Sequence, residues 1–170
     1  MAPLGRGSPP GLLPVALAIP RDLATPISVP FDTHPTGAYN SPEGGTEPIG
    51  NRIITVPEDQ SRVTKRDPHS GFIAYVPVGS LAKGEALVKN GGSGKTIPCA
   101  ICHGDTLQGL GNVPRIAGLH PIYIVRQLYL IKDGFRNGPD AQLMKKPVEK
   151  LTDDDILSIS AYVASLPPTK

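Results

Sequence analysis

The sequence predicts an all-α domain that follows a long irregular N-terminal segment, and three observations support this. Half of the 20 prolines lie before residue 50, where no apolar period is sustained. Convincing helical periodicity begins only after about residue 79. The last predicted helix carries a clear start signal. We therefore expect an N-terminal arm over residues 1–78 and a helical domain over residues 79–167.

The arm is expected to contribute little regular structure. Residues 1–50 are rich in Pro, Gly, Ser and Thr, and such a segment buries too little apolar surface to offset its ordering entropy. We expect residues 1–50 either to be disordered or to lie extended along a neighbouring part of the protein. Two β-like runs follow, at residues 52–56 and 72–76, and each is bounded by a proline. They could pair as a short hairpin, which we expect to dock on the helical domain because an isolated hairpin is marginal in water.

Three helices are predicted in the domain. Ser80 is a plausible N-cap for the first helix, and Asn90-Gly91-Gly92 ends it. The second runs from about Pro121 to Lys132, with a proline near its first turn. The third opens at Thr152, whose three following aspartates lie at the positive end of the helix dipole.

Bulk properties exclude several classes of function. A formal net charge of +2 is too mild to indicate nucleic-acid binding. No run of 18 apolar residues is present, so a membrane-spanning helix is excluded. Residues 1–18 combine Arg6, a short apolar stretch and an Ala16-Leu17-Ala18 triplet, but three prolines interrupt them. We interpret this segment as a weak or truncated export signal, or as a proline-rich tail.

The two cysteines form the strongest motif in the chain. Cys99 and Cys102 lie three residues apart, and His103 follows at once. This spacing is typical of covalent c-type haem attachment, in which each thiol adds to one vinyl group and the histidine meets the iron. A thioredoxin-like dithiol is the alternative, but it usually accompanies a βαβ unit, for which we find no pattern here. A zinc site would normally need more thiolates or a second histidine nearby.

Residues 79–167, which contain this cysteine motif, resemble a class I c-type cytochrome domain and are similar to small bacterial single-haem or tandem cytochromes. Besides the cysteine motif, the resemblance lies in these segments: residues 113–118, residues 123–128, Gly134-Phe135-Arg136, Leu143-Met144-Lys145, and residues 151–156 opening a last helix that contains Ala161-Tyr162. It implies a class I cytochrome c fold, with three main helices around one covalent haem. Residues 1–78 match no family that we recognise.

Met144 is the candidate sixth ligand of the haem iron. Apart from Met1 it is the only methionine, and in the family that this chain resembles the distal methionine sits here, in a loop before the last helix. A thioether ligand favours ferrous iron and raises the potential. The alternative is a methionine that fills a core gap, although two flanking lysines disfavour it. His120 is the runner-up ligand, and His34 and His69 are expected to be solvated.

The resemblance also implies supporting residues. The Pro114 carbonyl would accept a hydrogen bond from His103, fixing the ring. Four residues are candidates to hold haem propionates, or else are solvated helix residues: Tyr123, Arg126, Gln127 and Arg136. Gly84 and Tyr162 would lie where the first and last helices cross.

These expectations lead to an electron carrier without a catalytic role. With both axial sites filled by protein, the iron would have no position for a substrate. Three lysines at the expected haem edge would favour docking to redox partners with acidic surfaces, or else belong to an ordinary solvated surface: Lys95, Lys145 and Lys146. The alternatives are an electron-relay subunit of a dehydrogenase or oxidase complex, anchored by the arm, and a haem sensor or peroxidase with a labile sixth site. Because haem is attached outside the cytoplasm in bacteria, as the family implies, a periplasmic location is expected.

Overall fold

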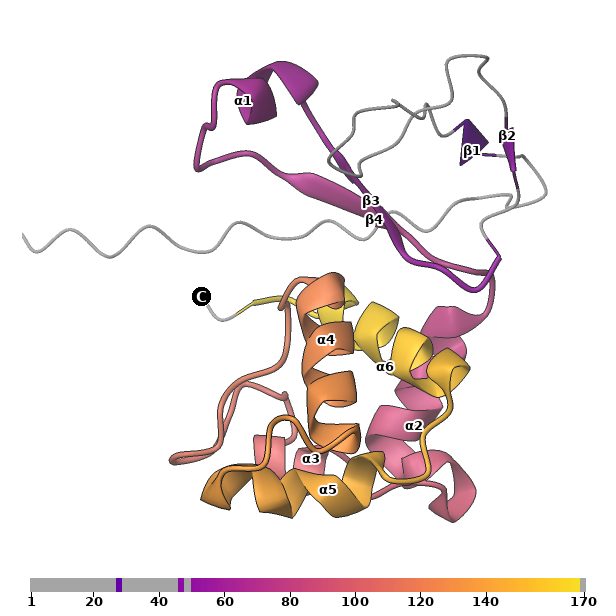
Figure 1. The fold of residues 1–170 in the computed structure, drawn as a ribbon, viewed down its shortest axis with the longest axis vertical. Helices are drawn as coiled ribbons and strands as arrows, with labels where there is room; N and C mark the ends of the chain where they lie inside the picture. The colour runs from indigo at the N-terminus through magenta and orange to yellow at the C-terminus, as the bar shows by residue number, and fades with distance from the viewer. Residues whose placement is uncertain (1–26, 29–45, 48–49, 169–170) are drawn as a thin grey trace, which may run out of the picture.

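The computed structural model describes residues 27–28, 46–47 and 50–168. Its main body is a bundle of three larger helices, with an antiparallel strand pair lying against one end of it (Figure 1). The described elements, in chain order, are β1 (Ile27–Ser28), β2 (Thr46–Glu47), β3 (Ile54–Pro57), α1 (Gln60–Thr64), β4 (Phe72–Tyr75), α2 (Ser80–Gly94), α3 (Ala100–His103), α4 (Pro121–Lys132), the 3-10 turn η1 (Pro139–Ala141), α5 (Gln142–Val148) and α6 (Asp153–Ser165). The class I cytochrome c fold predicted from the sequence is confirmed.

The predicted hairpin is present. Strand β3 pairs with β4 in antiparallel register, with Thr55 opposite Ala74. Strand β3 begins at Ile54, two residues later than predicted, and it includes Pro57, the proline that was expected to follow it. The chain between the strands forms α1, which the sequence did not predict and which Asp59 caps by accepting from the Ser61 and Arg62 amides. Most of the predicted irregular segment, residues 1–50, lies outside the described residues.

Helices α2 and α6 cross at very short range. A Cβ placed on Gly84 would lie 2.0 Å from the carbonyl oxygen of Ser158 and 2.7 Å from Cβ of Tyr162. Only a residue without a side chain permits this approach. The crossing therefore has the glycine that the resemblance implied, and it brings the apolar faces of the two helices into one core.

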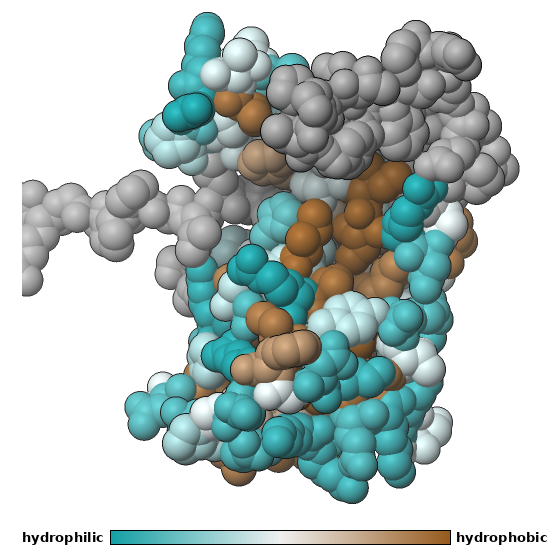
Figure 2. Space-filling view, viewed as in Figure 1, coloured by the Kyte–Doolittle hydropathy of each residue, from teal (hydrophilic) through white to brown (hydrophobic). Residues whose placement is uncertain are grey.

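The core is apolar and continuous across the helices. It contains Leu87 and Val88 of α2, Ile124 of α4, and Ile156 and Val163 of α6, all buried. Figure 2 shows apolar side chains gathered where the strand pair meets the helices, above a largely hydrophilic lower half. The helices thus bury one side each and leave polar side chains outside.

The helix ends agree only partly with the predictions. Helix α4 has the bounds that the sequence predicts, and α6 begins with a capping box in which Thr152 and Asp155 exchange hydrogen bonds. For α2 the predicted cap is wrong: Gly79 is the N-cap, and Ser80 is the first helical residue and is buried. Regular α2 geometry ends at Gly91, whose φ of 69° is left-handed, as the glycine pair predicted.

Candidate haem-attachment site

Both cysteines lie on one tight turn. Helix α3 is only four residues long, and its backbone is fixed at the start because the Cys99 amide donates to the Val88 carbonyl at 2.9 Å. The His103 amide then donates to the Cys99 carbonyl, also at 2.9 Å. Neither cysteine forms a disulfide; Cys102 is exposed and Cys99 is partly buried. Both thiols are therefore free to react and lie one helical turn apart.

The two alternative uses of these thiols fit the structure poorly. Burial raises the pKa of Cys99 to about 11, and the neighbouring Cys102 adds to this. A thioredoxin-like dithiol instead needs a lowered thiol pKa, and it follows a strand, whereas α3 follows α2. Within residues 27–28, 46–47 and 50–168, no three His, Cys, Asp or Glu side chains are placed to hold a metal ion. A zinc centre among them therefore has no support.

The imidazole of His103 is buried and held in one orientation. Only 5% of the residue is exposed, and Nδ1 lies 2.8 Å from the carbonyl oxygen of Pro114. A carbonyl oxygen only accepts, so Nδ1 donates in this contact, and Nε2 is the ring nitrogen left to face a ligand. This is the arrangement in which a histidine ligates a metal while a backbone partner fixes its ring. The contact is the one that the resemblance implied.

The loop after α3 brings Pro114 back to His103. The Gly109 amide donates to the His103 carbonyl at 2.9 Å, and Leu110 and Val113 form an isolated antiparallel bridge. Gly109 has a φ of 93°, and a Cβ there would lie 2.7 Å from the Val113 carbonyl oxygen. A larger residue would displace the loop, so this glycine is part of the support for His103.

Met144 lies on a helix and not in the predicted loop. It is the third residue of α5, a seven-residue helix that contains Pro147. A loop was expected because Met144 precedes the last helix at the place where the resembled family has its distal methionine, whereas here the chain is helical through Pro147. Met144 is partly buried and packs against the same core cluster as Cys99. The Thr96 hydroxyl donates to the Pro147 carbonyl at 2.6 Å, which places α5 beside the segment leading to Cys99.

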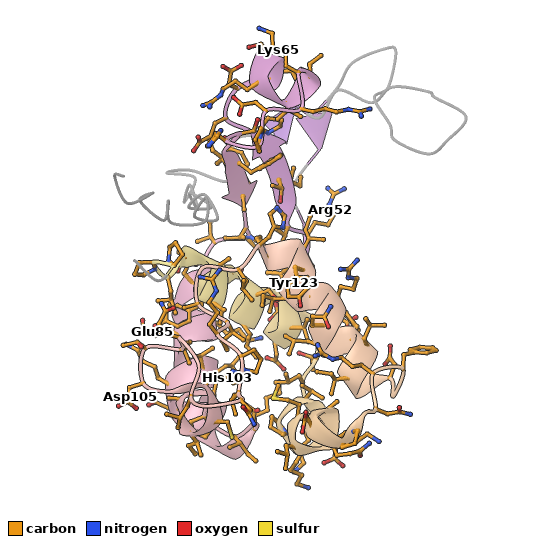
Figure 3. The ribbon with its side chains drawn as sticks, turned by 90° about the vertical axis from the view of Figure 1, so that its left-hand side faces the viewer. Arg52, Lys65, Glu85, His103, Asp105 and Tyr123 are labelled. Carbon is orange, nitrogen blue, oxygen red and sulfur yellow. The ribbon has the colours of Figure 1, made fainter. Side chains whose placement is uncertain are left out.

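The four candidates for holding propionates form two pairs. The guanidinium carbon of Arg126 lies 5.8 Å from the centroid of the Tyr123 ring, and Nη1 of Arg136 donates to Oε1 of Gln127 at 2.5 Å. Figure 3 places Tyr123 near the strand pair and His103 in the lower half of the molecule. A role for these side chains toward a propionate stays a prediction.

The other histidines are engaged elsewhere. His120 immediately precedes α4, where its ring meets Phe72 of β4 edge-on, with centroids 6.2 Å apart. Burial lowers the pKa of His120. His69 is exposed and its Nδ1 lies 3.2 Å from Asp67, while His34 lies outside the described residues. His120 thus joins the strand pair to the helices.

Two of the three lysines expected at a docking rim are paired with carboxylates of the same chain. Lys95 forms an ion pair with Asp155, and Lys146 lies 3.1 Å from Glu149. Lys83 of α2 also reaches Asp155, at 2.8 Å. Burial alone would raise the pKa of Asp155, but hydrogen bonds from Lys83, Lys95 and Thr152 hold it well below its usual range. These ion pairs make the expected haem edge less positive than the three lysines alone would indicate.

Three supporting residues were missed from the sequence: Thr96, Gly109 and Asp155. Thr96 and Asp155 act through partners far away in the chain, at Pro147 and Lys83 respectively. Gly109 sits in a loop of several glycines, and nothing in the sequence distinguishes it from Gly111. Only Asp155 had a local signal, as one of three aspartates after the N-cap Thr152, and that signal indicated only a favourable charge at the positive end of the helix dipole.

The donor set fits a covalently held haem. Two free thiols stand one turn apart, and the histidine beside them is buried with Nδ1 engaged by Pro114. A single thioether, that of Met144, packs against the same core. These are the groups that haem c requires: two sulfurs for its vinyl groups, and nitrogen and sulfur for the iron.

Comparisons with known proteins agree. The sequence model of the family "Cytochrome c" matches residues 81–167. The chain is 36% identical over 75 residues to cytochrome c-554(548) of Halomonas halodenitrificans, covering 44% of this chain and 90% of that protein. It is 37% identical over 106 residues to the thiosulfate dehydrogenase electron acceptor of Thiomonas intermedia, covering 59% of this chain and 49% of the relative.

A solved structure supports the same assignment. Reduced cytochrome c4 from Pseudomonas stutzeri matches with a TM-score of 0.50 and 29% identity, over 57% of this chain and 53% of that one. The chain thus spans about half the length of this structure and of the Thiomonas relative. Because the family's pattern covers just over half of the 170 residues, the chain belongs to the cytochrome c family, whose members carry covalently bound haem c.

Proposed function

We propose that this protein is a one-electron carrier and not an enzyme, with haem c attached at Cys99 and Cys102 and ligated by His103 and Met144. The observation that supports it most is the contact between Nδ1 of His103 and the Pro114 carbonyl. His103 directly follows Cys102, the second of the two free thiols. It orients a buried imidazole for ligation on the turn where covalent attachment would occur. The bound haem would supply the one-electron couple.

In this proposal the polypeptide keeps the groups that bind the haem in fixed positions. Two thioether bonds and one histidine from a five-residue stretch would fix the ring, and the Pro114 carbonyl would keep the imidazole from rotating. Met144 would hold the other face from α5. Little then rearranges when an electron arrives or leaves. With His103 and Met144 both ligating the iron, no position would be open for a substrate, which favours the carrier over a sensor or peroxidase.

A relay role beside a dehydrogenase is the second candidate. The similarity to the thiosulfate dehydrogenase electron acceptor covers 59% of this chain, more than the 87 of 170 residues matched by the family model. Residues upstream of the haem domain are therefore the natural place for an anchoring contact. Size-exclusion chromatography of the native extract would separate the two roles, because a free carrier elutes as a monomer and a relay subunit with its partner.

Location and partners follow from the same chemistry. Covalent haem attachment outside the bacterial cytoplasm leads us to place the mature protein in the periplasm, where its donor and acceptor are redox proteins. Among the described residues, no helix has the length and apolar character to cross a membrane. Since Lys95 and Lys146 pair within the chain, we expect docking to depend only weakly on ionic strength.

A reduced-minus-oxidised spectrum combined with a redox titration tests this proposal. We expect low-spin c-type bands, a weak far-red band of ferric iron from methionine ligation, and a single one-electron step. A high-spin ferric spectrum would contradict the closed-iron carrier. Retention of haem after denaturation and acidic organic extraction would establish covalent attachment.

A further inference from the structure

Helix α5 is poorly supported by its own hydrogen bonds. The first four amides and the last four carbonyls of an α-helix have no partner within it, which is more than half of the backbone groups of a seven-residue helix, and Pro147 has no amide to donate to Leu143. At its end, the Glu149 amide donates to the Lys145 carbonyl at 3.0 Å and the Leu151 amide to the Val148 carbonyl at 3.1 Å. Carbonyls of this last turn need partners from elsewhere.

Thr96 supplies one such partner from a distant part of the chain. Its hydroxyl donates to the Pro147 carbonyl at 2.6 Å, across 51 residues, and the contact is partly buried. Thr96 stands three residues before Cys99. Its own amide donates to the Gly91 carbonyl at 3.0 Å, so the donor is held by the turn that ends α2. A rigid segment therefore holds the end of a weakly bonded helix.

The segment is also anchored on its other side. Lys95, next to Thr96, pairs with the carboxylate of Asp155, which is fully buried at the start of α6. Lys83 from α2 pairs with the same carboxylate. The segment is thus bonded to α2 through the Gly91 carbonyl and to α6 through Asp155, independently of α5. The Thr96–Pro147 contact therefore fixes α5 relative to the cysteine turn.

We propose that Thr96 is a positioning residue for Met144: its hydrogen bond to Pro147 keeps α5, and with it the methionine thioether, seated against the haem iron. The inference rests on the proposed function, in which Met144 is the sixth ligand. A thioether is a weak ligand, so its occupancy of the iron depends on how rarely α5 opens. Met144 lies three residues before Pro147, one turn from the point that Thr96 holds.

The test uses the full-length holoprotein and measures the affinity of ferric iron for imidazole, which must displace Met144. Thr96→Val removes the hydroxyl at nearly constant volume, and Thr96→Ser keeps it. We expect the valine variant to bind imidazole about fivefold more tightly, the effect of one ordinary hydrogen bond, and to show a weaker far-red band. The serine variant should match the wild type.

The matched control is Thr64→Val, which removes another threonine hydroxyl that donates to a backbone carbonyl, that of Gln60 in α1, at 2.9 Å. It should leave imidazole affinity unchanged. An unchanged affinity in Thr96→Val, even with lower unfolding stability, would overturn the proposal, as would a serine variant that behaves like valine. If Thr96→Val yields no holoprotein, the serine variant and Thr96→Ala are compared in the same way.

A parallel measurement on Met144→Ala separates this inference from the proposed function. If that variant keeps the far-red band, Met144 is not the ligand and the ligand assignment itself fails. If it loses the band while Thr96→Val retains wild-type affinity for imidazole, the ligand assignment stands and only the role of Thr96 is lost.

Discussion

Gly84 on α2 lies so close to Ser158 on α6 that an added methyl carbon would sit 2.0 Å from the serine carbonyl oxygen. The two helices belong to opposite ends of the domain sequence, and their crossing closes the core over the cysteine turn through Leu87 and Val88. This contact involves backbone, so neither side can give way by changing a rotamer.

Gly84→Ala should therefore destabilise the holoprotein. Forcing the helices apart costs about 3 kcal/mol, while the better helix propensity of alanine returns about 1 kcal/mol. We expect a net loss of about 2 kcal/mol in the free energy of unfolding, measured by urea titration. Gly138→Ala is the control, because its Cβ meets nothing within 4 Å and its φ is −58°. Equal stability of the two variants would contradict the tight crossing.

Replacing the cysteines should abolish covalent attachment in steps. Cys99→Ala or Cys102→Ala alone leaves one thioether possible, and the double variant leaves none. Haem staining of denaturing gels and intact-protein mass spectrometry measure the outcome. Ile101→Ala is the control, since Ile101 is 67% exposed between the cysteines and contributes no donor. Covalent haem in the double variant would mean that attachment occurs elsewhere.

Met144→Ala should open the sixth position. The far-red ferric band should disappear, the reduction potential should fall because the soft thioether favours ferrous iron, and cyanide should bind readily. The neighbouring Leu143 is 77% exposed, so Leu143→Ala should leave all three properties unchanged. An unaltered spectrum in the methionine variant would exclude Met144 as the ligand.

Asp155→Asn should weaken the fold in a pH-dependent way. The folded-state pKa of Asp155 is lowered from a reference of 3.8, so its ionised form stabilises the protein fully above that reference value. This contribution disappears as pH falls below it toward the folded-state value. At pH 7 the variant should lose about 2 kcal/mol, less than the usual cost of breaking a buried pair because both lysines are partly exposed.

The measurement is urea unfolding of wild type and variant at pH 7 and at pH 3. The difference between them should be large at pH 7 and should shrink at pH 3. Asp154→Asn serves as control, because Asp154 pairs with the same Lys83 but is 54% exposed, and it should change stability by less than about 0.5 kcal/mol. A pH-independent difference for Asp155→Asn would contradict an ionised buried carboxylate.

Local signals predicted much of this fold. Three of these signals act within one turn of the chain, so they could be recognised without knowing the packing. They are the cap at Thr152, the proline at the start of α4 and the glycines in the last turn of α2. The pairing of β3 with β4 was also predictable from two apolar runs bounded by prolines. The haem-attachment motif could be recognised for the same reason, because Cys99, Cys102 and His103 lie within five residues of the sequence.

What the sequence could not predict depends on residues far apart. The partners of Lys95 and Thr96 follow 60 and 51 positions later, and no local pattern links them. Helix α5 was expected as a loop from the resemblance, and Pro147 disfavours a helix by local rules, so the helix depends on packing and on the Thr96 hydroxyl. Tertiary contacts, and not propensity, determined both outcomes.

The strand pair and the cysteine turn occupy opposite ends of the molecule (Figures 1 and 3). Phe72 holds β4 against His120 at one end, while the exposed Cys102 lies at the other. A tether or surface linkage introduced at the strand end would therefore leave the cysteine turn facing outward. If haem is held at that turn as proposed, attachment to an electrode through β3 and β4 would keep the haem end free to meet a soluble partner.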